Sequence, residues 1–192
     1  MARTGRRPGS EDTRGAILAA ARSSFAGHGF HATTIRAVAS GAGVDPALVH
    51  HYFGSKEDLF AAAIDLPLRP KEMAEEILSE GIDNAGERVA RMFLSVWDNP
   101  ASREPLQAML RGAFTNEQGA ATLREFFESV LLERVVPAVE LPDARLRVSL
   151  AAAQMLGLAV LRYVVGFEAL RQASVDDLVE LIAPRIQSYL TG

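Results

Sequence analysis

The stretch Phe25–Phe60, FAGHGFHATTIRAVASGAGVDPALVHHYFGSKEDLF, decides the fold of this chain. It predicts two short helices that cross steeply, joined by a turn. Ala39 provides the tiny side chain needed where two helix backbones approach, and Gly43 tolerates the positive φ of the turn. Asp45 and Pro46 suit the N-cap and first position of the second helix. This pattern is typical of a helix-turn-helix.

The two faces of this unit differ in chemistry. The apolar anchors have the spacing of an inward face, and they are Val38, Ala42, Val44 and Val49. The outward face of the second helix consists of Pro46, Ala47, Leu48, His50 and His51. A recognition helix enters the major groove of DNA with such an outward N-terminal part. The alternative is an ordinary αα-corner inside a domain, but two outward histidines followed by Lys56 favour double-stranded DNA as the partner.

The adjacent histidines also raise the question of a metal or catalytic site. Neighbouring residues of a helix point about 100° apart, so His50 and His51 do not face one centre. Helical metal sites prefer residues at positions i and i+4, as in HExxH, and His50 has no such partner. The sequence also lacks a phosphate-binding glycine loop, a nucleophile elbow and a carboxylate cluster. We therefore expect no catalytic residue, no metal ligand and no cofactor.

Composition agrees with a helical globular protein that binds a polyanion at one end. The 192 residues are 48% hydrophobic, with a mean hydropathy of +0.08 and no cysteine. The lack of cysteine excludes disulfides and thiolate chemistry and fits a cytoplasmic location. Residues 1–60 contain seven basic and five acidic residues, whereas the remainder contains 13 basic and 19 acidic residues. The front is thus positive and the rear negative, which points to the front as the part that meets nucleic acid.

The N-terminus is basic and has no apolar segment after it that would make a signal peptide. Arg3, Arg6 and Arg7 form a cationic arm, interpreted either as a minor-groove contact or as a solvated tail. The most apolar run, Val148–Leu161, has 14 residues and is expected to be too short to span a membrane. No membrane partner is therefore expected.

Helical periodicity dominates the whole chain, so the expected fold class is all-α. The first helix starts after the N-cap Ser10 and ends at GHGF (Gly27–Phe30), the second follows Thr33 or Thr34 and runs to about Ser40, and a fourth opens at Ser55. Further helices are expected at about 71–80, 85–98, 101–115, 118–140, 143–170 and 175–190. The domains are expected to be a flexible basic arm (1–9), a three-helix DNA-binding domain (10–66) and a larger helical domain (67–192).

The front of the chain resembles the DNA-binding domain of the TetR/AcrR family of bacterial transcriptional regulators. The resemblance covers about residues 10–65 and rests on a Gly-Phe before the Thr-Thr pair, then AVASGAGV, HYF, SK and LF. The helical remainder also resembles the ligand-binding and dimerisation domain of that family. The resemblance implies a homodimeric repressor of a palindromic operator that a small-molecule effector releases. The alternative is a small-molecule-binding helical protein or enzyme without a DNA role.

The resemblance also implies roles for single residues. Phosphate contacts fall to Thr33, Thr34 and Lys56, backbone contacts to His51 and Tyr52, and base contacts to Pro46, Ala47, Leu48 and His50. Many members of the family have Tyr at the position of His50 and His at the position of Tyr52. The aromatic contact is therefore changed, and the operator of better-known relatives does not transfer to this chain.

The rear part contains candidate residues for an apolar or amphipathic ligand. They combine bulk or polarity with an apolar setting, and they are Met92, Trp97, Phe114, Phe127, Gln154, Arg162 and Tyr163. Flexible methionines and flat aromatic rings line binding cavities well, although the same residues also build ordinary cores. Arg162 is equally interpreted as a surface charge or as part of a dimer salt bridge.

The last two helices are expected to form the dimer interface. Ser149–Phe167 is apolar nearly all round and rich in Ala and Gly, which allow helices to approach closely. A helix that is apolar on every face must bury every face. Two such helices from each subunit would form a twofold four-helix bundle. The fourth helix, Ser55–Asp65, is expected to link the ligand site mechanically to the DNA-binding face.

Overall fold

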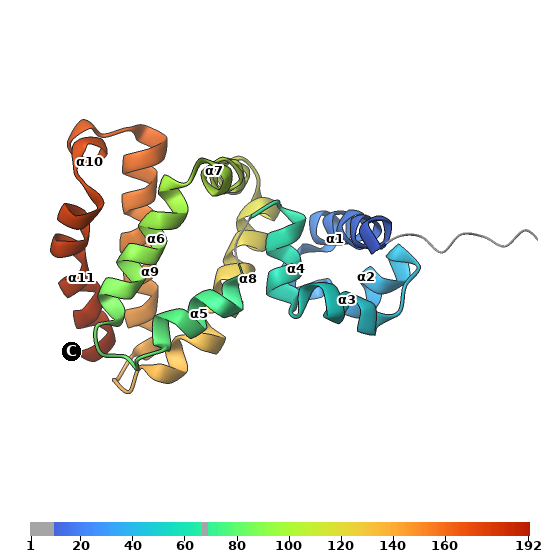
Figure 1. Cartoon of the computed structure of the whole chain (residues 1–192), viewed down its shortest axis with the longest axis horizontal. Coiled ribbons are helices and arrows are strands. Elements are labelled where there is room, and N and C mark those ends of the chain that lie inside the picture. The colour runs from blue at the N-terminus through green and yellow to red at the C-terminus, as the bar shows by residue number, and fades with distance from the viewer. Residues whose placement is uncertain (1–9, 67–68) are drawn as a thin grey trace, which may run out of the picture.

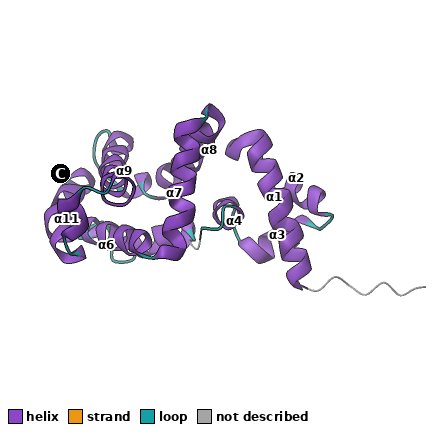
Figure 2. Cartoon of the chain, turned by 90° about the horizontal axis from the view of Figure 1, so that it is seen from above, coloured by secondary structure: helices purple, strands orange, loops and turns teal. Residues whose placement is uncertain are grey.

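The computed structural model describes residues 10–66 and 69–192, and it confirms the all-α fold. A small front unit contains α1 to α4, and a larger rear unit contains α5 to α11 (Figure 1). Seen from above, α7 and α8 lie between the front helices and the group formed by α6, α9 and α11 (Figure 2). Helix α8 therefore stands at the junction of the two units.

Helix α1 (Ser10–Ala32) is interrupted at Gly29, whose φ of 81° and ψ of 178° are not helical. The predicted end of this helix, within Gly27–Phe30, therefore falls on a real break, although a further helical turn follows it. A side chain at Gly29 would also stand 3.1 Å from the Gln118 amide nitrogen of α8. Glycine therefore suits this position for two reasons. The backbone conformation favours glycine, and α8 of the rear unit lies close to it.

The helix-turn-helix forms as the sequence predicts. It consists of α2 (Ile35–Ala42) and α3 (Pro46–Phe53). The Thr34 hydroxyl accepts a hydrogen bond from the Ala37 N–H at 3.1 Å, and the Asp45 carboxylate accepts one from the Ala47 N–H at 2.8 Å. Gly43 has a φ of 68° and closes α2 in the left-handed conformation. These short-range bonds define both helices.

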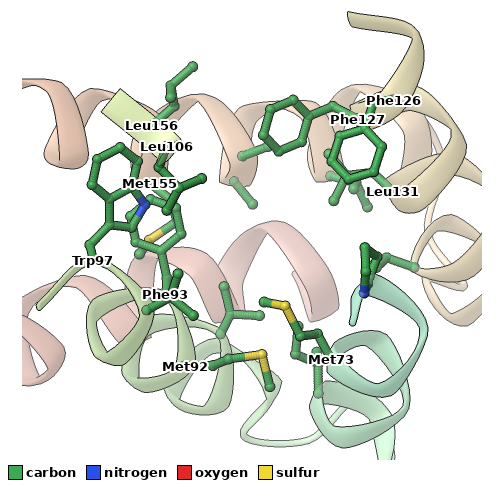
Figure 3. Close-up of a pocket in the computed structure, with 18 of the residues that line it drawn as sticks. Met73, Met92, Phe93, Trp97, Leu106, Phe126, Phe127, Leu131, Met155 and Leu156 are labelled. Carbon is green, nitrogen blue, oxygen red and sulfur yellow. The ribbon is translucent and has the colours of Figure 1, made fainter. Parts of the chain in front are cut away.

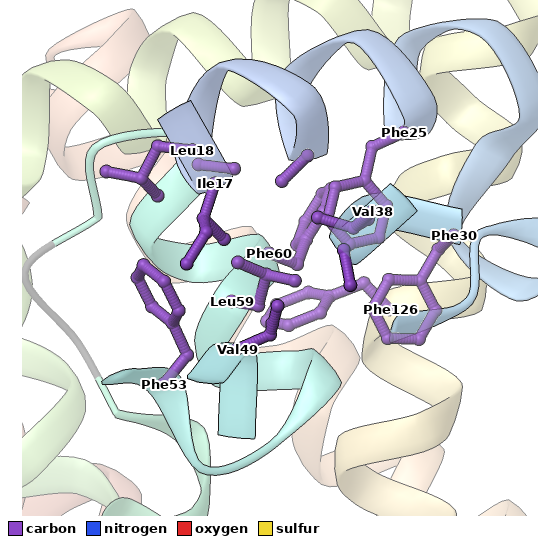
Figure 4. Packing of buried hydrophobic residues seen from close by; sticks show 13 residues of the cluster. Ile17, Leu18, Phe25, Phe30, Val38, Val49, Phe53, Leu59, Phe60 and Phe126 are labelled. Carbon is purple, nitrogen blue, oxygen red and sulfur yellow. The ribbon is translucent and has the colours of Figure 1, made fainter. Parts of the chain in front are cut away.

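Helix α4 (Lys56–Ala63) begins at the N-cap Ser55, whose hydroxyl accepts from the Asp58 N–H at 3.0 Å. Its Phe60 joins the front core together with Phe25 and Phe30 of α1 (Figure 4). The core also contains Phe126 of α8, with ring centroids 4.8 Å from Phe60 and 5.7 Å from Phe30. Phe126 of the rear unit thus completes the core of the front unit, and half-buried Val130 of α8 packs against it.

The rear helices differ from their predicted ranges mainly where they end. They are α5 (Pro70–Leu78), α6 (Ala85–Asp98), α7 (Pro100–Thr115), α8 (Glu117–Arg134), η1 (Val136–Ala138), α9 (Ala144–Ala159), η2 (Val160–Val165), α10 (Glu168–Gln172) and α11 (Val175–Thr191). The prediction of one helix over 143–170 is wrong, because α9 widens into the π-turn η2 and stops at Gly166, whose φ is 81°. The helix predicted to reach residue 140 ends at Arg134, and Pro137 lies in η1.

Helices α6 and α11 pack at very short range around Gly86. A Cβ atom at this position would stand 2.4 Å from the Ala183 carbonyl oxygen and 2.7 Å from the Gln187 nitrogen. The Gln187 side chain accepts from the Gly86 N–H at 2.8 Å and donates to the Ile82 carbonyl at 3.0 Å. The contact therefore requires glycine on one helix and an amide side chain on the other.

The expectation that the apolar run of α9 is too short to span a membrane is wrong. Helix α9 continues through η2, so the helical segment Ala144–Val165 has 22 residues and a mean hydropathy of 1.7. By length and composition alone this segment could cross a membrane, which is weak evidence because core helices pass the same test. Only 28% of its apolar window is buried within the chain. Most residues of this apolar window are therefore partly or fully exposed in the single chain.

Candidate nucleic-acid interface and ligand cavity

Helix α3 presents two distinct faces. Val49 and Phe53 are buried in the front core, whereas Ala47, Leu48 and His50 are exposed. Pro46 is half-buried at the start of the helix, and His51 is exposed near its end. The structure thus places the predicted base-facing residues together on the outer side of the helix-turn-helix.

The two histidines of α3 have different surroundings. The His50 Nδ1 atom lies 3.1 Å from the Gly54 carbonyl oxygen, which can only accept. Nδ1 therefore carries the proton in this contact, and a neutral His50 ring presents Nε2 as an acceptor. The His51 ring packs edge-on against the Tyr52 ring at 5.5 Å. The histidines thus act separately, as their angular separation on the helix predicts.

The two threonines before α2 divide their roles. Thr34 is exposed and caps the helix, so its hydroxyl stands at a helix N-terminus, where an anion is stabilised. Thr33 is only 1% exposed, and its hydroxyl donates to the Gly29 carbonyl at 2.8 Å and lies 3.1 Å from the Ser24 hydroxyl. The prediction of a phosphate contact by Thr33 is therefore corrected: its side chain stabilises the broken end of α1.

Lys56 lies at the point where α1, α4 and α8 meet. Its ammonium group donates to the His31 carbonyl at 3.1 Å and stands 4.6 Å from the centroid of the Phe30 ring. The His31 N–H donates in turn to the Glu125 carboxylate of α8 at 2.8 Å. The position of this lysine is therefore set by the same residues that join the front to the rear.

The front also contains Arg36 and the arginines of the predicted N-terminal arm. Arg36 is exposed on the first turn of α2, and the sequence analysis did not select it. Its position two residues after the threonine cap was the available signal. The predicted arm residues Arg3, Arg6 and Arg7 lie outside the described residues.

A cavity of about 220 Å³ lies mainly within the rear unit (Figure 3). Its walls come from α4 to α9 and α11. Of the predicted ligand residues, Met92, Trp97 and Phe127 line it. Trp97 lies opposite Phe126 and Phe127 across the cavity, and Met92 lies along the same wall as Phe93 (Figure 3). The cavity thus extends from the middle of the rear unit to the helix that reaches the front.

The other predicted ligand residues, Phe114, Gln154, Arg162 and Tyr163, are not among the described residues that line the cavity. Phe114 is 71% exposed near the end of α7. The Arg162 guanidinium donates to the backbone carbonyls of Leu170 and Ala173, so it holds η2 against the residues before α11. The Arg162 side chain therefore serves the fold, and Phe114 lies at the surface.

Tyr163 lies directly behind the cavity wall. Its ring stacks on Trp97 at 5.4 Å, and its hydroxyl donates to the Asp98 carboxylate at 2.7 Å. Burial and, after it, the hydrogen bond to Asp98 raise the pKa of Tyr163 to about 12. The tyrosine therefore remains neutral and supports the indole from the side away from the cavity.

Sequence reasoning missed most of the cavity wall, in particular Met73, Met109, Met155 and Phe126. One signal was available. The chain has five methionines, and all four beyond Met1 line this cavity. The tertiary contact was needed to show that helices distant in sequence bring them together.

Both units match families of known proteins. Residues 17–63 match the family described as bacterial regulatory proteins, tetR family. Residues 83–190 match the tetracycline repressor-like C-terminal domain. Together they cover the helix-turn-helix and almost the whole rear unit. The chain belongs to the TetR family.

The TetR-family assignment agrees with individual relatives. A crystal structure of a TetR-family regulator from Streptomyces coelicolor A3 is 41% identical, covers 98% of this chain and 99% of that one, and has a TM-score of 0.55. An HTH-type transcriptional repressor of Mycobacterium tuberculosis is 35% identical over 92 residues, 45% of this chain and 49% of that protein. The regulator BetI of Rhizobium meliloti is 36% identical over 107 residues, 56% of this chain and 44% of that protein. The chain thus spans about half the length of the curated relatives it matches.

TetR-family proteins are DNA-binding regulators, not enzymes. Within the described part of the chain, no three His, Asp or Glu side chains gather where they could hold a metal ion. The geometry that characterises this protein is therefore a helix-turn-helix joined by α8 to an apolar cavity.

Proposed function

We propose that this protein is a cytoplasmic, homodimeric transcriptional repressor that leaves a palindromic operator when a small molecule fills the rear cavity. The observation that carries the proposal is the outward face of α3 on a complete helix-turn-helix. The family supports the same conclusion, because its members are DNA-binding regulators. The cavity supplies a place for the effector.

The proposed DNA contacts follow from position on the front unit, where Pro46, Tyr52 and Lys56 are half-buried and the other residues are exposed. Thr34 and Lys56 bind phosphates, while His51 and Tyr52 approach the DNA backbone. Pro46, Ala47, Leu48 and His50 face the bases, and apolar Ala47 and Leu48 suit thymine methyl groups. Because a neutral His50 presents Nε2 as an acceptor, it suits the amino group of adenine or cytosine. A guanine contact would need an N–H at Nε2 instead.

The proposed dimer interface is an apolar stripe along α9 and η2. Its members recur every three or four residues, lie exposed or half-exposed, and are Leu146, Leu150, Ala153, Gly157, Leu161 and Val164. Leu181 of α11 is 74% exposed. A Cβ at Gly157 would meet no atom within 4 Å, so a partner helix has room to approach there. A second copy of the chain would cover this uncovered face.

Ligand release is proposed to act through α4 and α8 together. Ala61 and Leu66, in and just after α4, line the cavity and continue the predicted mechanical link. Phe126 of α8 lines the same cavity while its ring packs on Phe60 and Phe30, and Phe30 lies beneath Lys56. A ligand that displaces Phe126 therefore changes the support of a proposed phosphate contact. Phe126→Leu is expected to retain both binding activities and to reduce the factor by which each ligand weakens the other.

The DNA-binding proposal is tested by gel shift against the DNA upstream of the gene and against a selected DNA library. Lys56→Ala is expected to weaken binding and to lower the salt slope by about one. Lys71→Ala is the matched control, because Lys71 is the only other lysine and pairs with Glu75 on α5 at 3.8 Å. If the native protein retains no DNA, the repressor proposal fails and a ligand-binding protein without a DNA role becomes the better hypothesis.

The dimer proposal is tested by the mass of the protein in solution. Leu150→Glu places a charge in the middle of the stripe and is expected to give a monomer. Phe114→Glu changes a more exposed apolar residue outside the stripe and is expected to leave the dimer intact. A monomeric native protein, or a dimer that survives Leu150→Glu, would contradict the proposed interface.

A further inference from the structure

We infer that the cavity selects an uncharged, largely hydrocarbon molecule and rejects organic cations and anions of the same shape. The inference rests on the proposed role of the cavity as the effector site, and it narrows the ligand to one chemical class. The evidence is the chemistry of the wall, the state of the nearest charges and the type of flexible side chain present.

The wall contains no charged side chain among the described residues that line it. These residues are all Ala, Leu, Ile, Val, Pro, Met, Phe or Trp. The Trp97 indole N–H is the one conventional hydrogen-bonding side-chain group in that set. An ion that entered would lose its hydration and find no counterion. A neutral apolar molecule would gain the favourable transfer of its surface out of water.

Asp98, next to the wall residue Trp97, does not line the cavity and already has partners. Its carboxylate accepts from the Tyr163 hydroxyl at 2.7 Å and lies 3.8 Å from the Arg162 guanidinium. The stacked rings of Tyr163 and Trp97 stand in this region, and Trp97 alone of the four residues lines the cavity. Arg162 is in turn held by two backbone carbonyls. This cluster therefore offers a bound ion no counterion.

The size of the cavity suits a small hydrophobic molecule. An apolar protein cavity of about 150 Å³ stays dry and binds benzene. The 220 Å³ cavity of this protein is larger, so it suits a monocyclic hydrocarbon with a short alkyl chain. The ligand class is thus limited in both polarity and volume.

The methionines allow the wall to adjust to ligands of different shape, but they provide no group that would stabilise a charged ligand. Met73, Met92, Met109 and Met155 come from four different helices, α5, α6, α7 and α9. Unbranched thioether side chains adjust to ligands of different outline, and their sulfur is a weak hydrogen-bond acceptor at most. Related hydrocarbons are therefore expected to bind with similar affinity.

The test compares three probes on the full-length protein. They are n-propylbenzene, phenethylammonium, in which an ammonium replaces the terminal methyl group, and phenylacetate. Trp97 is the only tryptophan in the chain and lies in the wall, so its fluorescence reports occupancy. We expect saturable binding of n-propylbenzene that is at least about a hundredfold tighter than binding of either ion. Shifts of the ε-methyl NMR signals of the four wall methionines would place the probe inside the cavity.

Two variants of Met92 sharpen the test. Met92→Glu introduces a carboxylate into the wall and is expected to raise the affinity for phenethylammonium at least about tenfold. Met92→Gln, which is polar and uncharged, is the matched control and is expected to give no such gain. Thermal unfolding of both variants checks that they fold, and the comparison of probes on the native protein stands if either does not.

Equal or tighter binding of phenethylammonium or phenylacetate to the native protein would overturn the inference. Failure of n-propylbenzene to saturate the Trp97 signal would overturn it as well. The repressor proposal has a separate readout, the gel shift. If the gel shift shows no DNA binding, the relative affinities of the three probes still test the chemistry of the cavity. If those affinities contradict the inference, the gel-shift result still stands.

Discussion

The front and rear of this protein achieve helical structure in different ways. In the front, the N-caps Thr34, Asp45 and Ser55 each accept a hydrogen bond from the helix that they begin. In the rear, α7, α8 and α11 also begin at capping side chains, whereas α5, α6 and α9 begin without a side-chain cap bond and depend on packing between distant segments. The short helices of the DNA-binding surface are therefore fixed by hydrogen bonds between residues close in sequence. The shape of the cavity instead depends on how helices distant in sequence pack together.

Phe126→Ala should have the largest effect, because this side chain belongs to both regions. It fills the front core and lines the rear cavity. Loss of a buried phenylalanine ring should lower the free energy of unfolding by about 3–5 kcal/mol. Phe114→Ala, at an exposed position, should change it by less than about 0.5 kcal/mol. Denaturant unfolding measures both values, and similar values for the two variants would refute the bridging role.

Gly86→Ala should rank next and should act on the rear alone. The added methyl group would collide with the backbone of α11, so the free energy of unfolding should fall by about 1–3 kcal/mol. Gly15→Ala is the control in α1, where a Cβ meets no atom within 4 Å, and it should raise stability by about 0.5–1 kcal/mol. Thermal and denaturant unfolding should show changes of opposite sign in the free energy of unfolding for the two variants. Changes of the same sign would contradict this account.

Thr34→Ala should cost about 1 kcal/mol, because it removes the cap of α2. Thr34→Asp should preserve most of the stability, since aspartate also caps helices well. Thr115→Ala is a control at an exposed threonine near the end of α7 that caps no helix start. Urea unfolding would measure the free energy of unfolding of the three variants. An equal loss in Thr34→Ala and Thr115→Ala would show that the cap of α2 makes no special contribution to stability.

Tyr163→Phe ranks last, and its distinctive effect is on how stability depends on pH in alkaline solution. The folded pKa of Tyr163, about 12, lies above its ordinary value of 10, so folding favours the protonated phenol. Its contribution is complete below pH 10 and is lost as the pH rises from 10 towards 12. The phenylalanine variant should therefore lose less stability over that interval than the native protein. Unfolding midpoints from pH 9 to 12 measure this, and parallel curves would contradict it.

The front was largely predictable because its determinants lie close together in sequence. Gly43 and the Asp45–Pro46 pair identify the turn and the start of α3 within a few residues. The assignment of Thr33 failed for the opposite reason. The break at Gly29 brings the Gly29 carbonyl and the Ser24 hydroxyl to Thr33 and buries it, and composition does not show this folding back.

The rear was predictable in type but not in detail. Periodicity indicated its helices, yet the π-turn and Gly166 stop after α9 depend on how Arg162 is held by residues that follow it. Selection by polarity pointed to Arg162 and Tyr163, whereas the cavity excludes both and keeps only apolar neighbours. Trp97 and Asp98 are neighbours in sequence, yet Trp97 lines the cavity and Asp98 binds the Tyr163 hydroxyl outside it. Only the directions of their side chains in the fold separate these two roles.

The sequence by itself determined the all-α class, the helix-turn-helix and the outward face of α3, because capping and helical periodicity act over three or four residues. Only the tertiary structure decided that Phe126 completes the front core and that four methionines from separate helices share one cavity. The physical reason is the range of the interactions. Hydrogen bonds at a cap join near neighbours, whereas burial of apolar surface joins any residues that the fold brings together.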